Sequence, residues 1–331
     1  MQNEDDLKKR ALDYHQLPKP GKIGIEVTKS ASTQDDLTLA YSPGVAAPVR
    51  AIANDEQDAY KYTNKGNLVL IVTDGTAVLG LGNTGALASK PVMEGKSLLF
   101  KIYADVDVFD IEVKCDTPEE FIETVARIAP GFGGINLEDI AAPHCFEIEK
   151  RLKKKLDIPV FHDDQHGTAV ITAAGMMNAL TLQEKKIEDV KVVCTGAGAA
   201  GIACMKMLMH LGLKKENIYM IDRKGVITTD RTDLNEHKQE FANPNTDKRT
   251  LVEAMTGADA LVGVSGPGIV TPEMIKSMAD RPIVFALSNP DPEIWPQEVK
   301  AVRDDAIVAT GRSDFPNPVS YTHLTLPTKR I

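Results

Sequence analysis

The feature that most constrains this chain is a glycine-rich turn that joins an apolar strand to a helix. The strand runs from Val190 to Thr195, and the turn reads Gly196-Ala197-Gly198-Ala199-Ala200-Gly201. An uninterrupted helical pattern follows to Leu211, and the next apolar strand ends near Asp222. Such glycines let the backbone approach a phosphate at the helix N-terminus, and an acid about twenty residues later binds a ribose hydroxyl. The segment predicts a dinucleotide-binding βαβ unit, with a tight packing turn as the alternative.

The residues around Asp222 leave the choice of dinucleotide open. An acid at this position favours NAD, because it repels a 2′-phosphate. Arg223 and Lys224 follow directly, and their cations suit that phosphate. We expect a modest preference for NADP, with NAD as the alternative.

A second glycine pattern lies in the first half of the chain. Gly80-Leu81-Gly82-Asn83-Thr84-Gly85 has the same glycine spacing. A strand precedes it, but we expect Pro91 to interrupt the helix that follows, and no clean second strand ends in an acid. Glycine spacing alone therefore does not identify the cofactor loop.

Apolar strands and helical patterns alternate from Asp157 onward, which indicates a parallel, doubly wound sheet. The first half mixes strands and helices, including one that Thr117 caps and Pro118 begins. We expect an α/β fold with an N-terminal α/β domain over residues 1–160 and a Rossmann-type domain over 161–317. The expected strands are 67–72, 135–137, 159–161, 191–195, 218–221, 260–264, 283–287 and 307–309, and the expected helices are 96–104, 117–129, 167–181, 198–211, 248–255 and 272–278.

Two pairs of acidic residues follow expected strands. Glu138 and Asp139 come after one strand, and Asp163 and Asp164 after another. Oxygen ligands of this kind suit Mg²⁺ or Mn²⁺, although a single acidic pair is more often a solvated turn. His162 and His166 suggest zinc less strongly, because one can cap the helix and the other can pack beside it.

Two further side chains are candidates for proton transfer. Lys96 precedes an apolar helix, and a lysine that is partly buried beside carboxylates can act as a base. Tyr41 stands in a turn containing proline and glycine, which could aim its phenol at a ligand. Taken alone, a surface lysine and a half-buried packing tyrosine explain these residues better than catalytic roles do.

Composition excludes several classes of function. The net charge of −9 argues against nucleic acid and anionic membranes as partners, and no apolar run is long enough to span a bilayer. The basic run 150–155 is expected to be the solvated end of a helix. The four cysteines form no C-x-x-C pair, which is typical of a reducing compartment, so we expect a cytoplasmic protein.

With these motifs in place, the chain resembles the malic enzymes, in particular the bacterial small-subunit type. The resemblance runs from the N-terminus to about Asn317, and its Phe-x-Asp-Asp-x-x-Gly-Thr block is highly specific. The matching segments are 41–45, 80–85, 91–96, 134–139, 161–169 and 286–290.

The resemblance implies an oxidative decarboxylation of L-malate to pyruvate and CO₂ that reduces NADP or NAD and needs Mg²⁺ or Mn²⁺. It implies a homodimer or higher homo-oligomer. Its implied site comprises a metal set of Glu138, Asp139 and Asp164, a base Lys96 held by Asp163, an acid Tyr41, and cofactor contacts from Asn289 and from the loop Gly80, Gly82, Asn83, Thr84 and Gly85.

The C-terminus departs from the family pattern after Asn317. We expect residues 318–331 to be a disordered, non-native tail on a truncated chain. Two alternatives to a working malic enzyme remain: an inactive remnant that still binds cofactor, and a metal-independent NAD(P) dehydrogenase of amino acids or folates.

Overall fold

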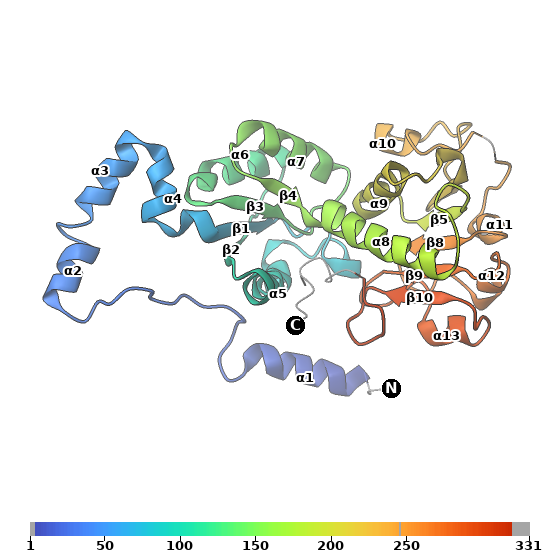
Figure 1. Cartoon of the computed structure of the whole chain (residues 1–331), viewed down its shortest axis with the longest axis horizontal. Helices are drawn as coiled ribbons and strands as arrows, with labels where there is room; N and C mark the ends of the chain where they lie inside the picture. Colours follow the sequence, from blue (N-terminus) through green and yellow to red (C-terminus); the bar gives the residue numbers. More distant parts are fainter. Residues whose placement is uncertain (1–3, 245, 320–331) are drawn as a thin grey trace. The chain divides into compact units, whose positions relative to one another are not determined.

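The computed structural model describes residues 4–244 and 246–319 (Figure 1). Its contacts group the chain into two compact units. Unit 1 comprises Met1–Gly75, Thr84–Glu138 and Lys150–Val160, and unit 2 comprises Thr76–Asn83, Asp139–Glu149 and Phe161–Ile331. This grouping does not test the expected domain boundaries at residues 160 and 317, which stay predictions.

The first sheet has the strand order β2-β1-β3-β4. Strand β1 pairs in parallel with both of its neighbours. The chain moves outward from β1 to β2 and then back across β1 to β3. Since crossovers are right-handed, the helices of these two connections belong on opposite faces. The strands are β1 (Leu68–Thr73), β2 (Asp107–Glu112), β3 (Gly134–Leu137) and β4 (Val160–His162).

Helix α5 (Ala86–Ala104) makes the first of these crossovers and packs against β1 and β2 (Figure 1). It passes through Pro91 without a break, so the expected interruption there was wrong. Proline inside a helix removes a backbone hydrogen bond at a cost of roughly 3 kcal/mol. Packing of the helix against β1 and β2, with Met93 fully buried, offsets that cost.

Helix α6 (Pro118–Ile128) begins as the sequence predicted. The Thr117 side chain accepts a hydrogen bond from the backbone N–H of Glu120 at 3.2 Å, and Pro118 occupies the first turn. Phe121, Ile122 and Val125 are buried. In α7 (His144–Lys155) the basic run fills the last turn, as expected, where cations suit the helix dipole.

The N-terminal helices contribute nothing to this core. They are α1 (Glu4–Gln16), α2 (Gln34–Ala40), α3 (Ala46–Asn54) and α4 (Ala59–Tyr62). Helices α2, α3 and α4 bury no residue, although several of their apolar side chains are exposed. Short 3-10 helices occur at Glu56–Asp58, Asn64–Asn67, Leu79–Leu81, Ala129–Gly131 and Lys215–Asn217.

The second sheet has the order β10-β9-β8-β5-β6-β7. All of its pairings are parallel except the short hairpin of β6 with β7. The expected parallel, doubly wound sheet is therefore confirmed. The strands are β5 (Val192–Thr195), β6 (Ile218–Asp222), β7 (Gly225–Val226), β8 (Ala260–Gly263), β9 (Ile283–Ala286) and β10 (Ile307–Thr310).

Alternate residues of these strands belong to two separate cores. Val192 and Cys194 pack with α8 (Asp163–Leu182) and α9 (Ala199–His210), whereas Val193 belongs to the core of the opposite face. That opposite core is completed by α11 (Leu251–Met255), α12 (Pro272–Lys276) and α13 (Pro296–Lys300). A parallel sheet needs both faces covered, which explains why its strands are apolar throughout. The remaining helix is α10 (Glu236–Gln239).

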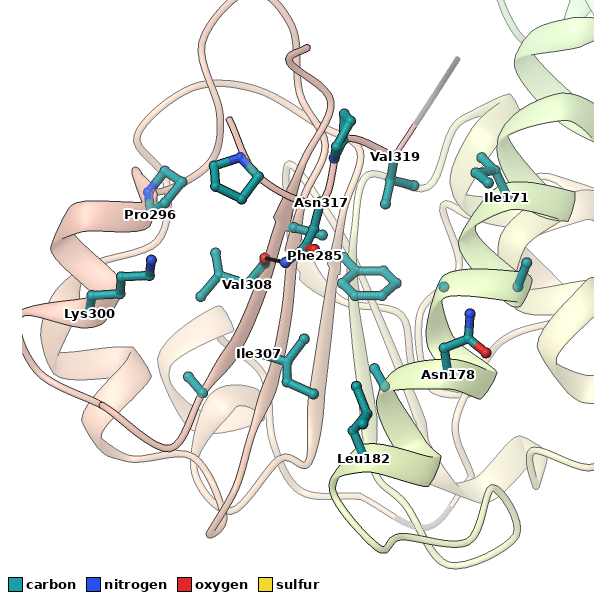
Figure 2. A pocket seen from close by; sticks show the side chains of 17 residues that line it. Ile171, Asn178, Leu182, Phe285, Pro296, Lys300, Ile307, Val308, Asn317 and Val319 are labelled. Atoms are coloured by element: carbon teal, nitrogen blue, oxygen red, sulfur yellow. Dashed lines mark hydrogen bonds between the residues drawn. The ribbon is translucent and has the colours of Figure 1, made fainter. Parts of the chain in front are cut away.

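An apolar groove of about 760 Å³ lies within unit 2, between α8 and the β10 edge of the sheet (Figure 2). Ile171 and Leu182 of α8, Phe285 of β9 and Ile307 of β10 line it (Figure 2). Val319 also lines the groove and is buried, and its backbone N–H donates to the Thr310 carbonyl at 2.7 Å. The expected disorder from residue 318 is therefore wrong for Pro318 and Val319, and the rest of the expected tail, residues 320–331, lies outside the described residues.

The four cysteines are free, and Cys145, Cys194 and Cys204 are buried. Burial raises the pKa of the Cys204 thiol to about 12, as expected for a small apolar core residue. None of the helices described combines the length and apolar character needed to cross a membrane.

The turn between β5 and α9 provides a stability test. A Cβ on Gly201 would overlap the carbonyl oxygen of Gly196, whereas a Cβ on Gly198 would meet no atom within 4 Å. We expect Gly201→Ala to lower the free energy of unfolding by about 2 kcal/mol or more, because overpacking forces a backbone shift. The control Gly198→Ala should change it by less than about 1 kcal/mol. Urea unfolding followed by circular dichroism measures both, and equal effects would contradict the packing described.

Candidate functional site

The glycine turn after β5 lies where the connections of the second sheet diverge. From β5 the chain proceeds to β6 on one side, whereas β8 lies on the other. Gly196 has a φ of +101°, and a Cβ there would overlap the Val264 carbonyl that follows β8. Ligands of doubly wound sheets bind at such a switch point, outside the carboxyl ends of the strands.

The geometry of this turn is consistent with both alternatives, dinucleotide binding and tight packing. Gly196 and Gly201 are required by close backbone contacts, which is the packing explanation. Gly198 precedes α9, and the position of its missing Cβ is open space. The N-terminus of this 12-residue helix thus has room for a phosphate at its unpaired backbone N–H groups.

Asp222 ends β6 as predicted, but its carboxylate is already engaged. It accepts hydrogen bonds from Arg231 at 2.8 and 3.0 Å, from Lys238 at 2.8 Å and from the backbone of Lys224 at 2.9 Å. Burial alone would raise the pKa of Asp222, but the hydrogen bonds from Arg231 and Lys238 outweigh it and lower this pKa to about 2. Sequence reasoning missed Arg231 and Lys238, because both lie beyond the βαβ unit.

A buried carboxylate that the sequence did not reveal holds the loops beside this turn. Glu293 is fully buried and accepts hydrogen bonds from the backbone N–H groups of Ser265, after β8, and Ser288, after β9. Burial raises its pKa. The neighbouring Asn289, predicted to contact the cofactor, donates through its side-chain amide to the Gly311 carbonyl at 3.2 Å.

In unit 1, the predicted base Lys96 is paired with a predicted metal ligand. Its Nζ lies 3.1 Å from Oε1 of Glu138, and both side chains are 6% exposed. The Asn136 amide donates to the other oxygen of Glu138 at 2.8 Å. The helix α5 and the end of β3 thereby bring together two residues that are distant in sequence.

The three predicted metal ligands form a compact group. One ligand oxygen from each of Glu138, Asp139 and Asp164 lies within 4.8 Å of the others. Oxygens opposite each other around Mg²⁺ are about 4.2 Å apart, so small side-chain movements would close this set on the ion. The oxygen donors and the spacing both fit Mg²⁺ or Mn²⁺.

The second acidic pair directly follows β4, as the sequence predicted, although α8 begins there and not at the expected Gly167. Asp163 and Asp164 form the first turn of α8, where negative charge is favourable. The Asp164 carboxylate accepts a hydrogen bond from the backbone N–H of Asp139 at 2.9 Å. Asp163 is buried, and its predicted role beside Lys96 stays a prediction.

The histidines of this segment do not join that group. His166 Nε2 lies 2.7 Å from the buried carboxylate of Glu149. His162 is fully buried, and burial lowers its pKa. Among the residues described, the only group of three or more possible metal-binding side chains contains no histidine, which gives no support to zinc.

The remaining predicted site residues lie on exposed segments. In the loop from Gly80 to Gly85, Gly82 and Gly85 have positive φ angles of 76° and 80°, and the Gly82 carbonyl accepts from the backbone of Val78. Tyr41 follows α2 and is 76% exposed. The cofactor role of the loop and the acid role of Tyr41 stay predictions.

Known proteins match this chain over nearly its whole length. The family models "Malic enzyme, N-terminal domain" and "Malic enzyme, NAD binding domain" match residues 20–153, in two overlapping pieces, and 165–327. An NADP-dependent malic enzyme of Halomonas elongata is 59% identical, over 96% of this chain and 75% of that protein. Its Escherichia coli counterpart is 57% identical, but the chain spans only 42% of that protein's length.

An NAD-dependent relative and solved structures also match this chain. An NAD-dependent malic enzyme of Geobacillus stearothermophilus is 54% identical over 91% of this chain and 63% of that protein. The crystal structure of Entamoeba histolytica malic enzyme has a TM-score of 0.91 and 39% identity, covering 96% of this chain and 68% of that one. With two matching domains and this degree of identity, the chain belongs to the malic enzyme family.

Proposed function

We propose that this protein oxidatively decarboxylates L-malate to pyruvate and CO₂ and reduces NADP, with NAD as the alternative acceptor. The observation that carries the proposal is the buried pair of Lys96 and Glu138, since Glu138 is also one of the three carboxylates predicted to bind the metal. A lysine buried against a carboxylate is suited to exchange a proton with a substrate hydroxyl. The names of the similar proteins support the same reaction.

In this proposal Lys96 accepts the proton of the malate C2 hydroxyl while hydride leaves C2 for the nicotinamide. The C3–C4 bond then breaks to release CO₂, and Tyr41 donates a proton to C3 of the resulting enolpyruvate. Glu138, Asp139 and Asp164 would hold Mg²⁺ or Mn²⁺, which polarises the C2 oxygen and stabilises the enolate charge when bound. Asp163 would orient Lys96, and Asn289 would contact cofactor and substrate.

We further propose a homodimer or higher homo-oligomer in the cytoplasm, with no nucleic-acid or membrane partner. Apolar side chains on α2 and α3 support the association, because Leu39 and Val49 are 67% and 59% exposed. Tyr41 lies on the same exposed segment. The four free cysteines are consistent with a reducing compartment.

The metal assignment predicts that Asp164→Asn loses most of the Mn²⁺-dependent malate oxidation, because the set loses a charged ligand. The exposed Asp189→Asn should retain wild-type turnover. Steady-state rates at limiting Mn²⁺, with and without EDTA, measure the effect. Wild-type turnover in Asp164→Asn would remove Asp164 from the metal set, and EDTA-resistant activity would favour a metal-independent dehydrogenase.

The two proton-transfer roles predict losses at different steps. Lys96→Ala should lower malate oxidation by about 10²-fold or more, because no base remains for the hydroxyl. Lys90→Ala on the same helix removes ion pairs with Asp110 and Glu112 of β2 and should keep most activity. Tyr41→Phe should slow tritium exchange into pyruvate. A fully active Tyr41→Phe enzyme would refute the acid role.

The association proposal predicts that Leu39→Glu combined with Val49→Glu gives a monomer, since both charges would enter the contact. Neither side chain belongs to the core, so the melting temperature of the unit should change little. Leu87→Glu, at an 88% exposed position of α5, is the control. Light scattering after gel filtration measures the mass, and a dimeric double variant would place the interface elsewhere.

A further inference from the structure

Glu293 is a buried acid that the proposed mechanism does not use. Its side chain has no exposed surface, and burial raises its pKa. In the part of the chain that the structure describes, it forms no ion pair, and its carboxylate is held by hydrogen bonds from neutral groups. Burying an acid in this way costs free energy, and strongly perturbed acids cluster at functional sites.

On one side, the carboxylate holds the residue that follows β8 and supports the glycine turn. Its Oε1 accepts a hydrogen bond from the Ser265 backbone N–H at 2.8 Å and lies 3.3 Å from the Ser265 hydroxyl. A Cβ on Gly196 would overlap the Val264 carbonyl and would lie 3.2 Å from the Ser265 Cα. The first glycine of the turn therefore packs directly against the residues that Glu293 holds.

On the other side, the carboxylate holds the residue that precedes Asn289. Its Oε2 accepts a hydrogen bond from the Ser288 backbone N–H at 3.1 Å. Asn289, which is predicted to contact the cofactor, comes next, and its amide donates to the Gly311 carbonyl after β10 at 3.2 Å. Fixing the backbone at Ser288 therefore limits the positions that the Asn289 side chain can take.

The backbone of Glu293 is itself held in place. The Val270 N–H donates to the Glu293 carbonyl at 3.1 Å, and the Gly268 N–H donates to the Pro292 carbonyl at 3.1 Å. Gly263 leaves room for the side chain, because a Cβ there would lie 2.6 Å from the carboxyl carbon. Since both its backbone and its carboxylate are fixed, Glu293 forms a rigid link between the loops after β8 and β9.

We infer that Glu293 is a positioning residue that holds the glycine turn and Asn289 in the arrangement that the nicotinamide cofactor requires, which rests on the proposed function for the cofactor's identity. Ligands of doubly wound sheets bind outside the carboxyl ends of the strands, where both of these loops lie. A carboxylate suits this task because it accepts from both backbone N–H groups at once. An amide in its place would present a donor to one of them.

The test measures cofactor binding without turnover. Nicotinamide fluorescence of NADPH, or of NADH if it binds more tightly, gives the dissociation constant on the full chain. Glu293→Gln keeps the size of the side chain and should raise this constant about tenfold or more, because a buried N–H loses its acceptor. The control Glu298→Gln, an exposed acid that accepts from the Trp295 backbone, should leave it within about twofold.

Gly263→Ala tests the same link without altering Glu293. The added Cβ would displace the carboxylate from both N–H groups, so cofactor binding should weaken about tenfold here as well. Amide hydrogen exchange provides a local readout that a general loss of stability would not reproduce. In both variants the segments containing Ser265 and Ser288 should exchange faster, while β5 stays protected. If Gly263→Ala does not fold, Ser265→Ala replaces it, removes the hydroxyl contact with Glu293, and should weaken binding about threefold.

Wild-type cofactor affinity in a folded Glu293→Gln variant would overturn the inference. Faster exchange spread evenly over the whole of unit 2 would also overturn it, because Glu293 would then act only on stability. Absent malate turnover in the wild-type chain, together with cofactor binding that Glu293→Gln weakens, would instead contradict the proposed reaction alone.

Discussion

The carboxyl edge of the second sheet depends on one buried carboxylate, that of Glu293. It accepts hydrogen bonds from the backbone after β8 and after β9, and the Ser265 hydroxyl that it contacts donates to Thr195 at the end of β5. Three strand ends are thereby joined through one side chain. Gly263 permits this approach, because a Cβ there would lie 2.6 Å from the Glu293 carboxyl carbon. Burying a charged group costs free energy unless hydrogen bonds satisfy it. Here the hydrogen-bond donors are backbone N–H groups in the loops that border the glycine turn.

Buried charge is compensated in different ways along this chain. Burial outweighs the backbone hydrogen bonds to Glu293 and raises its pKa, whereas the hydrogen bonds from Arg231 and Lys238 outweigh burial at Asp222 and lower its pKa. Lys96 and Glu138 compensate each other in unit 1. A pair of this kind is sensitive to added charge, because a substrate anion or a divalent cation changes the electrostatic balance between its two groups. Sites of chemistry are commonly built from such pairs.

Much of the fold follows from local patterns. Thr117 and Pro118 mark the start of α6, and apolar runs mark the strands of the second sheet, because caps and buried strands depend on few neighbouring residues. Strand β2 was missed because its sequence, Asp107–Glu112, mixes acidic and apolar residues without regular alternation and only part of it is buried. The course of α5 through Pro91 was missed because packing on the sheet overrides local propensity. In the candidate site, the sequence showed the acidic ligands as pairs of adjacent residues. The partners of Asp222 and Glu293 could not be predicted, because they depend on contacts that form only in the folded chain.

The groove of Figure 2 borders the β10 edge of the second sheet. Strand β10 has one neighbouring strand, and both α13, through Pro296 and Lys300, and α8 line the groove beside it. Fewer buried contacts mean a lower free energy of local opening. The amide hydrogens of β10 should therefore exchange with solvent before those of β5, which lies between β8 and β6 in the interior of the sheet. The glycine turn follows this interior strand, so we expect its geometry to persist when the sheet edge opens locally.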